Sequence, residues 1–261
     1  MRTANGVSAV MIIYRANNPG EIFIEAKDDG HPLKLVRRQL CFIGGNWIGN
    51  GAVGDRGPRD TACRELNEEL SFDRPMQDTL ELALLGVADR EFMAPPTRKG
   101  DEFVPESDRK ALATLKEEIC KNATPYNMAF NSVSKEAILA ADPAYQRDAV
   151  SGLCCYFTVA LADYWWYMLT HLQQTYGNLS NESITLMTSL GEIIATGQKT
   201  AFGHDHALRR FFLSQGLPRA EELPMVDGAT SEVIGPVPES YEKLLQEWNI
   251  LKKPVTMPVA S

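Results

Sequence analysis

The stretch that decides the fold is Arg64-Glu65-Leu66-Asn67-Glu68-Glu69-Leu70-Ser71-Phe72. Its three glutamates, Glu65, Glu68 and Glu69, stand at positions i, i+3 and i+4. If the stretch is helical, their side chains share one face at separations of about 5–6 Å. Carboxylates this close repel one another, so their clustering indicates a cation among them. Oxygen ligands of this kind suit hard ions such as Mg²⁺ or Mn²⁺, which also bind water and substrate phosphates.

A glycine-rich segment precedes the acidic stretch. Gly44-Gly45 is followed by a loop at 49–58, which reads Gly-Asn-Gly-Ala-Val-Gly-Asp-Arg-Gly-Pro. Glycine permits backbone angles that other residues rarely adopt, so this loop is suited to tight turns. A glycine-rich loop that leads into a short acidic helix resembles the Nudix box, G-x5-E-x7-R-E-U-x-E-E-x-G-U, where U is an apolar residue.

The two halves of the box differ in how well they match. The second half fits at Arg64, Glu65, Leu66, Glu68, Glu69 and Phe72, while Ser71 stands where the family has glycine. In the first half, Arg56 occupies the position of the family's glutamate, and the loop is longer than in the family. Asp55 takes the part of that glutamate if the loop carries a one-residue insertion. The alternative interpretation is an ordinary solvated amphipathic helix, because Glu-Glu pairs are common on surfaces.

The order of predicted elements also fits the family. Apolar, β-branched runs predict strands at 7–14, 21–26, 39–43, 80–88 and 152–161, with a turn at 17–20. The acidic helix is expected to start at Pro58 with Asp60 or Thr61 as its cap, and to bury Ala62, Leu66 and Leu70. The segment 189–194 and a helix at 205–213 close the domain. This order is similar to the Nudix α/β/α sandwich with a mixed sheet, and we assign the domain to residues 1–215.

Two regions lie outside the resemblance. Residues 95–150 predict a charged, largely helical insertion, which is interpreted either as a lid or dimer contact or as a surface subdomain without a role in the site. Residues 216–261 form a proline-rich C-terminal extension with one predicted helix at 241–252. Leu244, Leu245, Trp248 and Leu251 give this helix an apolar face, which predicts docking on the domain or on a second subunit of a homodimer.

Composition narrows the class of protein. No apolar run reaches the roughly 18–20 residues of a membrane span, and the first residues lack the layout of a signal peptide. Cys41, Cys63, Cys154 and Cys155 lie in apolar or helical contexts, which predicts reduced cysteines and a cytoplasmic protein. The net charge of −8 argues against non-specific binding to nucleic acid. A nucleotide ligand remains compatible with this charge, because a bound metal ion reverses the local sign.

Three further polar groups permit two interpretations each. Gly203-His204-Asp205-His206 suggests a metal, but histidines at i and i+2 diverge, which favours Asp205 as a helix cap with partly exposed histidines. Glu192 fits either a site near the cleft or the first turn of a helix. The run Tyr164-Trp165-Trp166-Tyr167 fits either stacking on a nucleobase or burial in a core or interface.

The resemblance implies a chemistry. Glu65, Glu68, Glu69 and Asp55 are the expected ligands of Mg²⁺ or Mn²⁺, and Glu68 or Glu69 doubles as a base if one is needed. Arg64 is expected to fix a box carboxylate such as Glu65, and Gly44 and Gly45 to let the phosphates approach closely. The expected function is metal-dependent hydrolysis of a pyrophosphate linkage in a nucleoside diphosphate derivative. The competing hypothesis is a Nudix-like nucleotide-binding sensor without turnover, favoured by Arg56 and by the lengthened loop.

Overall fold

A mixed sheet lies at the centre of the protein. The structure is a computed structural model, which describes residues 3–4, 6–27, 31, 33–47, 55–72, 104–145, 150–180 and 183–250. Its eight strands are β2 (Val7–Arg15), β3 (Asn18–Ala26), β4 (Leu40–Cys41), β5 (Ile43–Asn46), β6 (Thr124–Val133), β7 (Val150–Leu161), β8 (Ile184–Ser189) and β9 (Ala229–Gly235). The order is β4-β3-β2-β7-β6-β9, with β5 paired to β2 and β8 to β3. Strands β2 and β7 are parallel, and the other pairs of this sheet are antiparallel.

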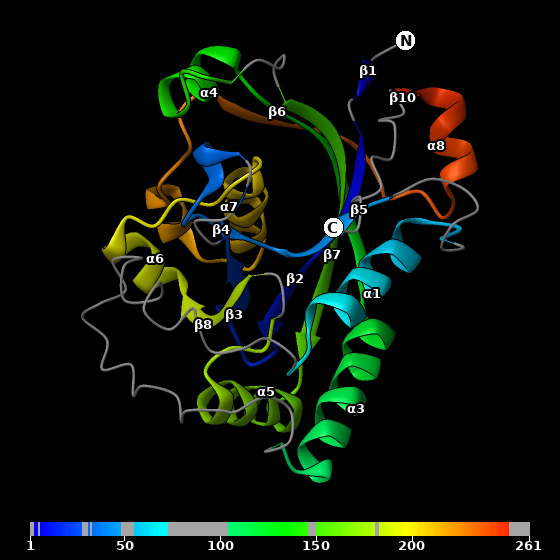
Figure 1. Ribbon diagram of the computed structural model, residues 1–261, viewed down its shortest axis with the longest axis vertical. Coiled ribbons are helices and arrows are strands. Elements are labelled where there is room, and N and C mark those ends of the chain that lie inside the picture. The colour runs from blue at the N-terminus through cyan, green and yellow to red at the C-terminus, as the bar shows by residue number, and fades with distance from the viewer. Residues whose placement is uncertain are drawn as a thin grey trace, which may run out of the picture.

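Helices cover both faces of the sheet (Figure 1). One face packs against α1 (Pro58–Glu69), α3 (Glu106–Asn122), α5 (Asp163–Tyr176) and α8 (Tyr241–Glu247). The other face packs against α6 (Leu190–Thr196) and α7 (His204–Ser214), while α4 (Lys135–Ala141) joins a smaller cluster with the 3-10 helix η1 (Lys34–Val36). A second 3-10 helix, η4 (Pro218–Glu222), follows α7. The predicted α/β class is therefore confirmed.

Strand alternation decides which side chains face which layer. In β7, Cys155 and Phe157 join the core beneath α1, whereas Cys154 and Tyr156 join the core beneath α7. The same alternation in β3 places Phe23 on the α1 side and Ile22 and Ile24 on the α7 side. Because successive residues of a strand point to opposite faces, both cores are built from the same few strands.

The predicted helical insertion at 95–150 is wrong in one central respect. Its described part contains α3 and α4, but between them lies β6, a ten-residue strand that pairs with both β7 and β9. Residues 104–145 are therefore part of the sheet domain. Two-sided pairing buries Met128 and Ala129, which local sequence did not reveal because the strand also carries polar residues such as Asn127 and Asn131.

The C-terminal region is likewise part of the domain. Strand β9 forms an edge of the main sheet, and β10 (Asn249–Ile250) pairs in parallel with β1 (Thr3–Ala4). Helix α8 ends at Glu247, which is earlier than the predicted 252. Leu244 and Trp248 are buried in the core beneath α1, so the predicted docking of this helix on the domain is confirmed. Leu251 lies outside the described residues.

The remaining strand and helix predictions have mixed outcomes. Strands at 7–14, 21–26 and 152–161 are confirmed by β2, β3 and β7, and the helix at 205–213 by α7. The predicted third strand at 39–43 is divided into β4 and β5. The predicted turn at 17–20 is displaced, because the turn between β2 and β3 lies at Ala16–Asn17 and β3 already begins at Asn18. The strand predicted at 80–88 lies outside the described residues.

Candidate functional site

The acidic helix is anchored by the chain that precedes it. Helix α1 begins at Pro58, and its N-cap is Gly57 without a side-chain hydrogen bond, so neither Asp60 nor Thr61 is the predicted cap. A Cβ atom at Gly57 would lie 2.2 Å from the carbonyl oxygen of Glu239, and the Tyr241 amide donates to the Arg56 carbonyl at 3.0 Å. Close packing against the segment before α8 explains the glycine at this position.

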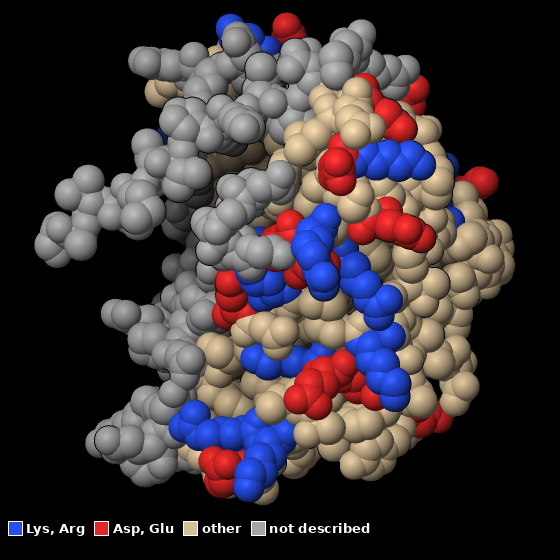
Figure 2. All heavy atoms as spheres, turned by 90° about the vertical axis from the view of Figure 1, so that its right-hand side faces the viewer, with Lys and Arg blue, Asp and Glu red and all other residues tan. Residues whose placement is uncertain are grey.

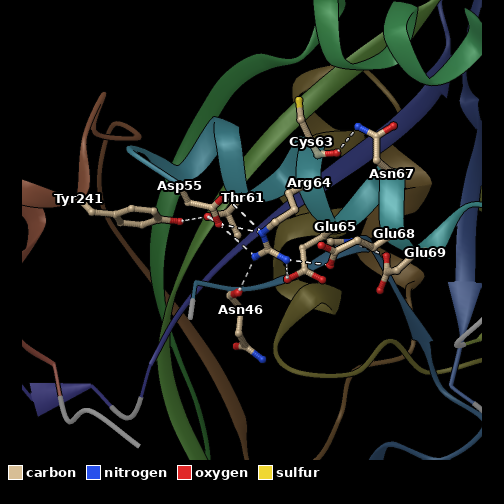
Figure 3. Close-up of polar contacts among 11 residues, drawn as sticks. Asn46, Asp55, Thr61, Cys63, Arg64, Glu65, Asn67, Glu68, Glu69 and Tyr241 are labelled. Carbon is tan, nitrogen blue, oxygen red and sulfur yellow. Dashed lines mark hydrogen bonds and ion pairs between the residues drawn. The ribbon is translucent and has the colours of Figure 1, made fainter. Parts of the chain in front are cut away.

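The Thr61 side chain instead joins α1 to two other parts of the site. Its hydroxyl donates to the carboxylate of Asp55 at 2.9 Å and lies 2.6 Å from the hydroxyl of Tyr241. All three residues are almost fully buried. This short chain of hydrogen bonds fixes the end of the glycine-rich loop and α8 against the first turn of α1 (Figure 3).

The guanidinium of Arg64 lies at the centre of the site (Figure 3). Its Nε donates to the two Asp55 oxygens at 3.3 and 3.1 Å, and its Nη2 lies 3.1 Å from Oδ2 of the same carboxylate. Nη2 also donates to the carbonyl of Asn46, the last residue of β5, at 3.2 Å. These contacts hold Arg64 between the loop and the strand, and because the pair is buried, removal of either partner would leave the other charge uncompensated.

Glu65 and Glu68 converge on one nitrogen of this arginine. Oε1 of Glu65 and Oε2 of Glu68 each lie 2.9 Å from Nη1 of Arg64. The Glu68 side chain is 53% exposed, whereas that of Glu65 is 15% exposed and lies against the backbone of β5. The predicted contact between Arg64 and Glu65 is therefore present, and Arg64 also brings a positive charge to Glu68.

Glu69 points away from this cluster and into the interior. Its Oε2 accepts a hydrogen bond from the Gly44 amide at 3.0 Å, and the residue is 3% exposed. Burial, followed by the nearby charge of Glu25, raises the pKa of Glu69 well above its usual range. The three helix carboxylates thus separate into a pair beside Arg64, the partly buried Glu65 and the exposed Glu68, and a buried third member, Glu69.

Two charged residues beneath Glu69 were not anticipated from the sequence. Glu25 of β3 is fully buried; its Oε2 lies 3.5 Å from the Nζ atom of Lys27, and its Oε1 has no hydrogen-bond partner among the described residues. The electrostatic influence of both residues reaches Glu69. The only sequence signal was charge at alternate positions of a buried strand, since Glu25 and Lys27 follow Phe23 on the face beneath α1.

The two predicted substrate-binding glycines have packing roles. Gly44 has a φ of +134°, and a Cβ atom there would lie 2.3 Å from the carbonyl oxygen of Ala9 in β2. A Cβ atom at Gly45 would lie 2.3 Å from Oε2 of Glu65. The Gly44 amide is already bonded to Glu69, so the pair serves chiefly to bring β5 against β2 and against the acidic helix.

A divalent cation fits only part of the predicted ligand set. No group of three or more His, Cys, Asp or Glu side chains within the described ranges is arranged to hold a metal ion. Asp55 faces Arg64 and Thr61, and Glu69 is buried. Glu65 and Glu68 do fit, because they converge on one positive centre, and Mg²⁺ is commonly held by one or two carboxylates together with waters and substrate phosphates.

The histidine-containing motif is buried in the other core. His204 is 5% exposed and stacks on Phe42 with ring centroids 4.8 Å apart, and its Nδ1 accepts from the Phe42 amide at 3.3 Å. Asp205 accepts from the amides of His206 and Val226, both at 2.8 Å. The N-cap of α7 is Gly203, so the predictions of an Asp205 cap and of an exposed His204 are wrong. Burial lowers the pKa of His204 to about 3.

Glu192 and the aromatic run lie on two other helices, α6 and α5. Glu192 is in the first turn of α6, where its carboxylate accepts from the hydroxyl of Thr188 at 3.3 Å. Tyr164, Trp165, Trp166 and Tyr167 all belong to α5. Trp166 is buried in the core, whereas Tyr164 and Tyr167 are 67% and 58% exposed, and Arg15 lies over the Tyr167 ring. This run is thus divided between core and surface.

The face that carries α1, α3 and α8 has mixed charge. Lys and Arg side chains lie next to Asp and Glu side chains across it (Figure 2). Ion pairs within helices contribute to this pattern, among them Lys110 with Glu106 and Lys121 with Glu118 on α3. None of the helices in the described residues is long and apolar enough to span a membrane.

No protein-family model matches this chain, and no curated protein matches it either.

Proposed function

We propose that this protein hydrolyses a pyrophosphate linkage in a nucleoside diphosphate derivative, with Mg²⁺ or Mn²⁺, in the manner of a Nudix hydrolase. The observation that carries the proposal is the convergence of Glu65 and Glu68 on one positive centre, 2.9 Å from each. Both residues match the second half of the Nudix box, and Glu68 is open to solvent. A phosphate-bearing ligand would reach the pair from that side.

Glu65 and Glu68 are the residues that would hold the ion. When bound, the ion neutralises phosphate oxygens and makes a bound water a better nucleophile. The protein contributes placement: Gly45 lets Glu65 lie directly against β5, and α1 sets the spacing between the two carboxylates.

Arg64 acts as a positioning residue in this proposal. Its contacts with Asp55 and with the Asn46 carbonyl do not involve Nη1, so the arginine keeps its place when Glu65 and Glu68 turn toward another cation. Its positive charge then remains beside the phosphates. Asp55 supports this position, which gives it a part in the site without direct contact to the ion.

Glu69 has a different part from the one expected of it. Burial raises the pKa of Glu69, and its carboxyl is already hydrogen-bonded, so it is a poorer ligand for a hard cation than an exposed carboxylate. Its bond to the Gly44 amide instead joins the last turn of α1 to β5. The role of Glu69 in this proposal is to align α1 with β5.

The test is a panel of nucleoside diphosphate derivatives incubated with Mg²⁺ or Mn²⁺, with products identified by mass. Removal of one preorganised electrostatic stabiliser typically costs about 10²–10³ in rate, so Glu65→Gln and Glu68→Gln should each lose that much. Glu117→Gln is the matched control, because Glu117 is exposed in the middle of α3. Equal rates in Glu68→Gln and Glu117→Gln would reject the assignment of the site.

A second candidate is a nucleotide-binding sensor without turnover. The observation that favours it is the neutralisation of Asp55, Glu65 and Glu68 by Arg64, which satisfies the cluster without a further cation. Calorimetric titration with the same panel separates the two functions. A sensor binds a derivative without cleaving it, with or without Mg²⁺, and Glu68→Gln binds it as tightly as the wild type.

A further inference from the structure

Two of the five cysteines form a contact between different helices. Cys63 of α1 and Cys120 of α3 lie where these two helices pack together, and each thiol is close enough to the other to shift its pKa, downward for Cys63 and upward for Cys120. Both are partly exposed, whereas Cys41, Cys154 and Cys155 are buried. The partly exposed thiols are therefore the two that lie at the same contact between α1 and α3.

Arg59 holds the two helices at this contact. Its Nη2 donates to the carbonyls of Cys120 and Lys121 at 2.8 and 3.0 Å, and Cys63, one helical turn after Arg59 on α1, lies within reach of the same positive charge. A second contact joins the helices near the end of α1, where Nζ of Lys116 on α3 donates to the carbonyls of Asn67 and Leu70 at 3.1 and 3.0 Å. The helices lie side by side (Figure 1), so the thiols meet in a supported interface.

We propose that Cys63 and Cys120 are a site of reversible thiol oxidation, at which a peroxide converts the pair into a disulfide between α1 and α3. Redox-active cysteines are typically partly exposed, lie near a positive group and have a second thiol within reach. The pair has all three properties. The buried cysteines lack the first.

The reaction balances with one peroxide for each disulfide. One thiol, which we assign to Cys63 because it lies within reach of the Arg59 charge, attacks a peroxide oxygen, breaks the O–O bond and becomes a sulfenic acid as the first water leaves. The Cys120 sulfur then attacks the Cys63 sulfur, the S–O bond breaks and the hydroxyl leaves with the Cys120 proton as a second water. The two sulfurs lose two electrons in total, and the peroxide gains them. A small-molecule thiol reverses the change by disulfide exchange.

The disulfide would act on the acidic helix without blocking the site. Cys63 directly precedes Arg64, but its sulfur points away from the carboxylates of Glu65 and Glu68 (Figure 3). The cross-link would fix α1 to α3 at the turn that carries Arg64. This inference concerns the thiols alone and does not depend on the proposed hydrolysis.

The experiment exposes the full-length, reduced protein to hydrogen peroxide in slight excess, blocks remaining thiols and maps peptides without reduction. The expected result is one intramolecular cross-link between the Cys63 and Cys120 peptides, with Cys41, Cys154 and Cys155 still blocked as thiols. Dithiothreitol should restore both thiols. The thermal midpoint should rise on oxidation and return on reduction, because a cross-link between distant segments constrains the unfolded chain.

Two variants make the result decisive. Cys63→Ser and Cys120→Ser each remove one partner, so peroxide should give no cross-link and no rise in the thermal midpoint in either. The proposal is overturned if peroxide oxidises Cys63 to sulfinic acid in the wild type without linking it to Cys120. A cross-link that appears only between separate molecules would overturn it as well.

Discussion

Arg64 and Asp55 form a buried ion pair in which the guanidinium contacts both carboxylate oxygens, at 3.1–3.3 Å. Asp55 precedes α1 in the chain, and Arg64 lies in the middle of that helix. The neighbouring Arg56, by contrast, has a side chain that is 91% exposed and contacts Asp60. The register of the loop therefore brings Asp55, and not residue 56, to the arginine of the acidic helix.

Loss of the Asp55 carboxylate should destabilise the protein. In Asp55→Asn, the guanidinium of Arg64 loses a charged partner in a buried position, so the free energy of unfolding should fall by about 1–3 kcal/mol. Arg56→Ala should change it by less than about 0.5 kcal/mol, because that side chain is exposed. Urea denaturation of both variants checks this. A larger loss in Arg56→Ala than in Asp55→Asn would contradict the assigned register.

The same pair tests the proposed catalysis. Residues that orient a metal ligand typically affect metal affinity or activity about 10–100-fold, and Asp55→Asn should reduce turnover by that amount. Arg56→Ala should retain the wild-type rate. Measured at a temperature at which both variants are folded, unchanged turnover in Asp55→Asn would show that Arg64 needs no support from this carboxylate.

Mg²⁺ should raise the melting temperature through Glu65 and Glu68. A ligand that binds only the folded state raises the free energy of unfolding, and the gain grows with the logarithm of the ligand concentration once that concentration exceeds Kd. The double variant Glu65→Gln and Glu68→Gln should lose this response, whereas Glu69→Gln should keep it, because Glu69 is buried apart from the pair. Differential scanning fluorimetry over a Mg²⁺ series provides the measurement. Retention of the shift in the double variant would place the ion elsewhere.

Glu69 should make stability depend on pH with a defined sign. The pKa of Glu69 is higher in the folded state than the usual 4.5 of an unfolded glutamate. Its contribution to the free energy of unfolding is therefore complete below pH 4.5 and is lost as the pH rises through the folded-state pKa. Glu69→Gln keeps an acceptor for the Gly44 amide but cannot ionise. The variant should therefore gain stability relative to wild type as pH increases from 4 to 8, in urea denaturation at each pH. A constant difference across this range would contradict the prediction.

His204 should produce the opposite dependence. Burial lowers its folded pKa to about 3 from an unfolded value of 6.5, so the neutral ring stabilises the fold above pH 6.5. Between these two values the unfolded chain gains a proton, and stability falls by about 1.4 kcal/mol per pH unit. His204→Leu should remove this part of the slope, although it lowers stability at neutral pH by leaving the Phe42 amide without its acceptor. If the free energy of unfolding falls equally steeply with decreasing pH below 6.5 in the wild type and in His204→Leu, the prediction is wrong.

Gly45→Ala should disturb the carboxylate pair beside Arg64. The added Cβ would lie 2.3 Å from Oε2 of Glu65, which must then leave its place beside Arg64. We expect a weaker Mg²⁺-dependent rise in melting temperature than in wild type. Gly191→Ala is the control, since its nearest new neighbour is the Ser189 hydroxyl at 4.0 Å. If both variants respond to Mg²⁺ as the wild type does, Glu65 is not a ligand.

Local sequence was sufficient where a pattern is repeated along one segment. The apolar runs of β2 and β7 and the i, i+4 spacing of Ala62, Leu66 and Leu70 predict elements that the fold contains, because burial of a strand or of a helix face requires such periodicity. The same spacing predicted that Glu65, Glu68 and Glu69 share one side of α1, which holds for Glu65 and Glu68 beside Arg64 and is wrong for Glu69. These features depend on residues only a few positions apart.

Tertiary structure decided whatever depends on residues far apart in the chain. Glu69 is buried where the last turn of α1 meets the Gly44 amide of β5, within electrostatic reach of Glu25 and Lys27, and no local spacing records these contacts. Strand β6 forms because β7 and β9 pair with it on both sides, which outweighs its polar residues. Asp55 reaches Arg64, and Cys63 reaches Cys120, through packing of separate segments. The sequence by itself determined the acidic helix and its strands, whereas long-range packing decided which of its charges stay exposed, because burial and ion pairing depend on neighbours that only the folded chain brings together.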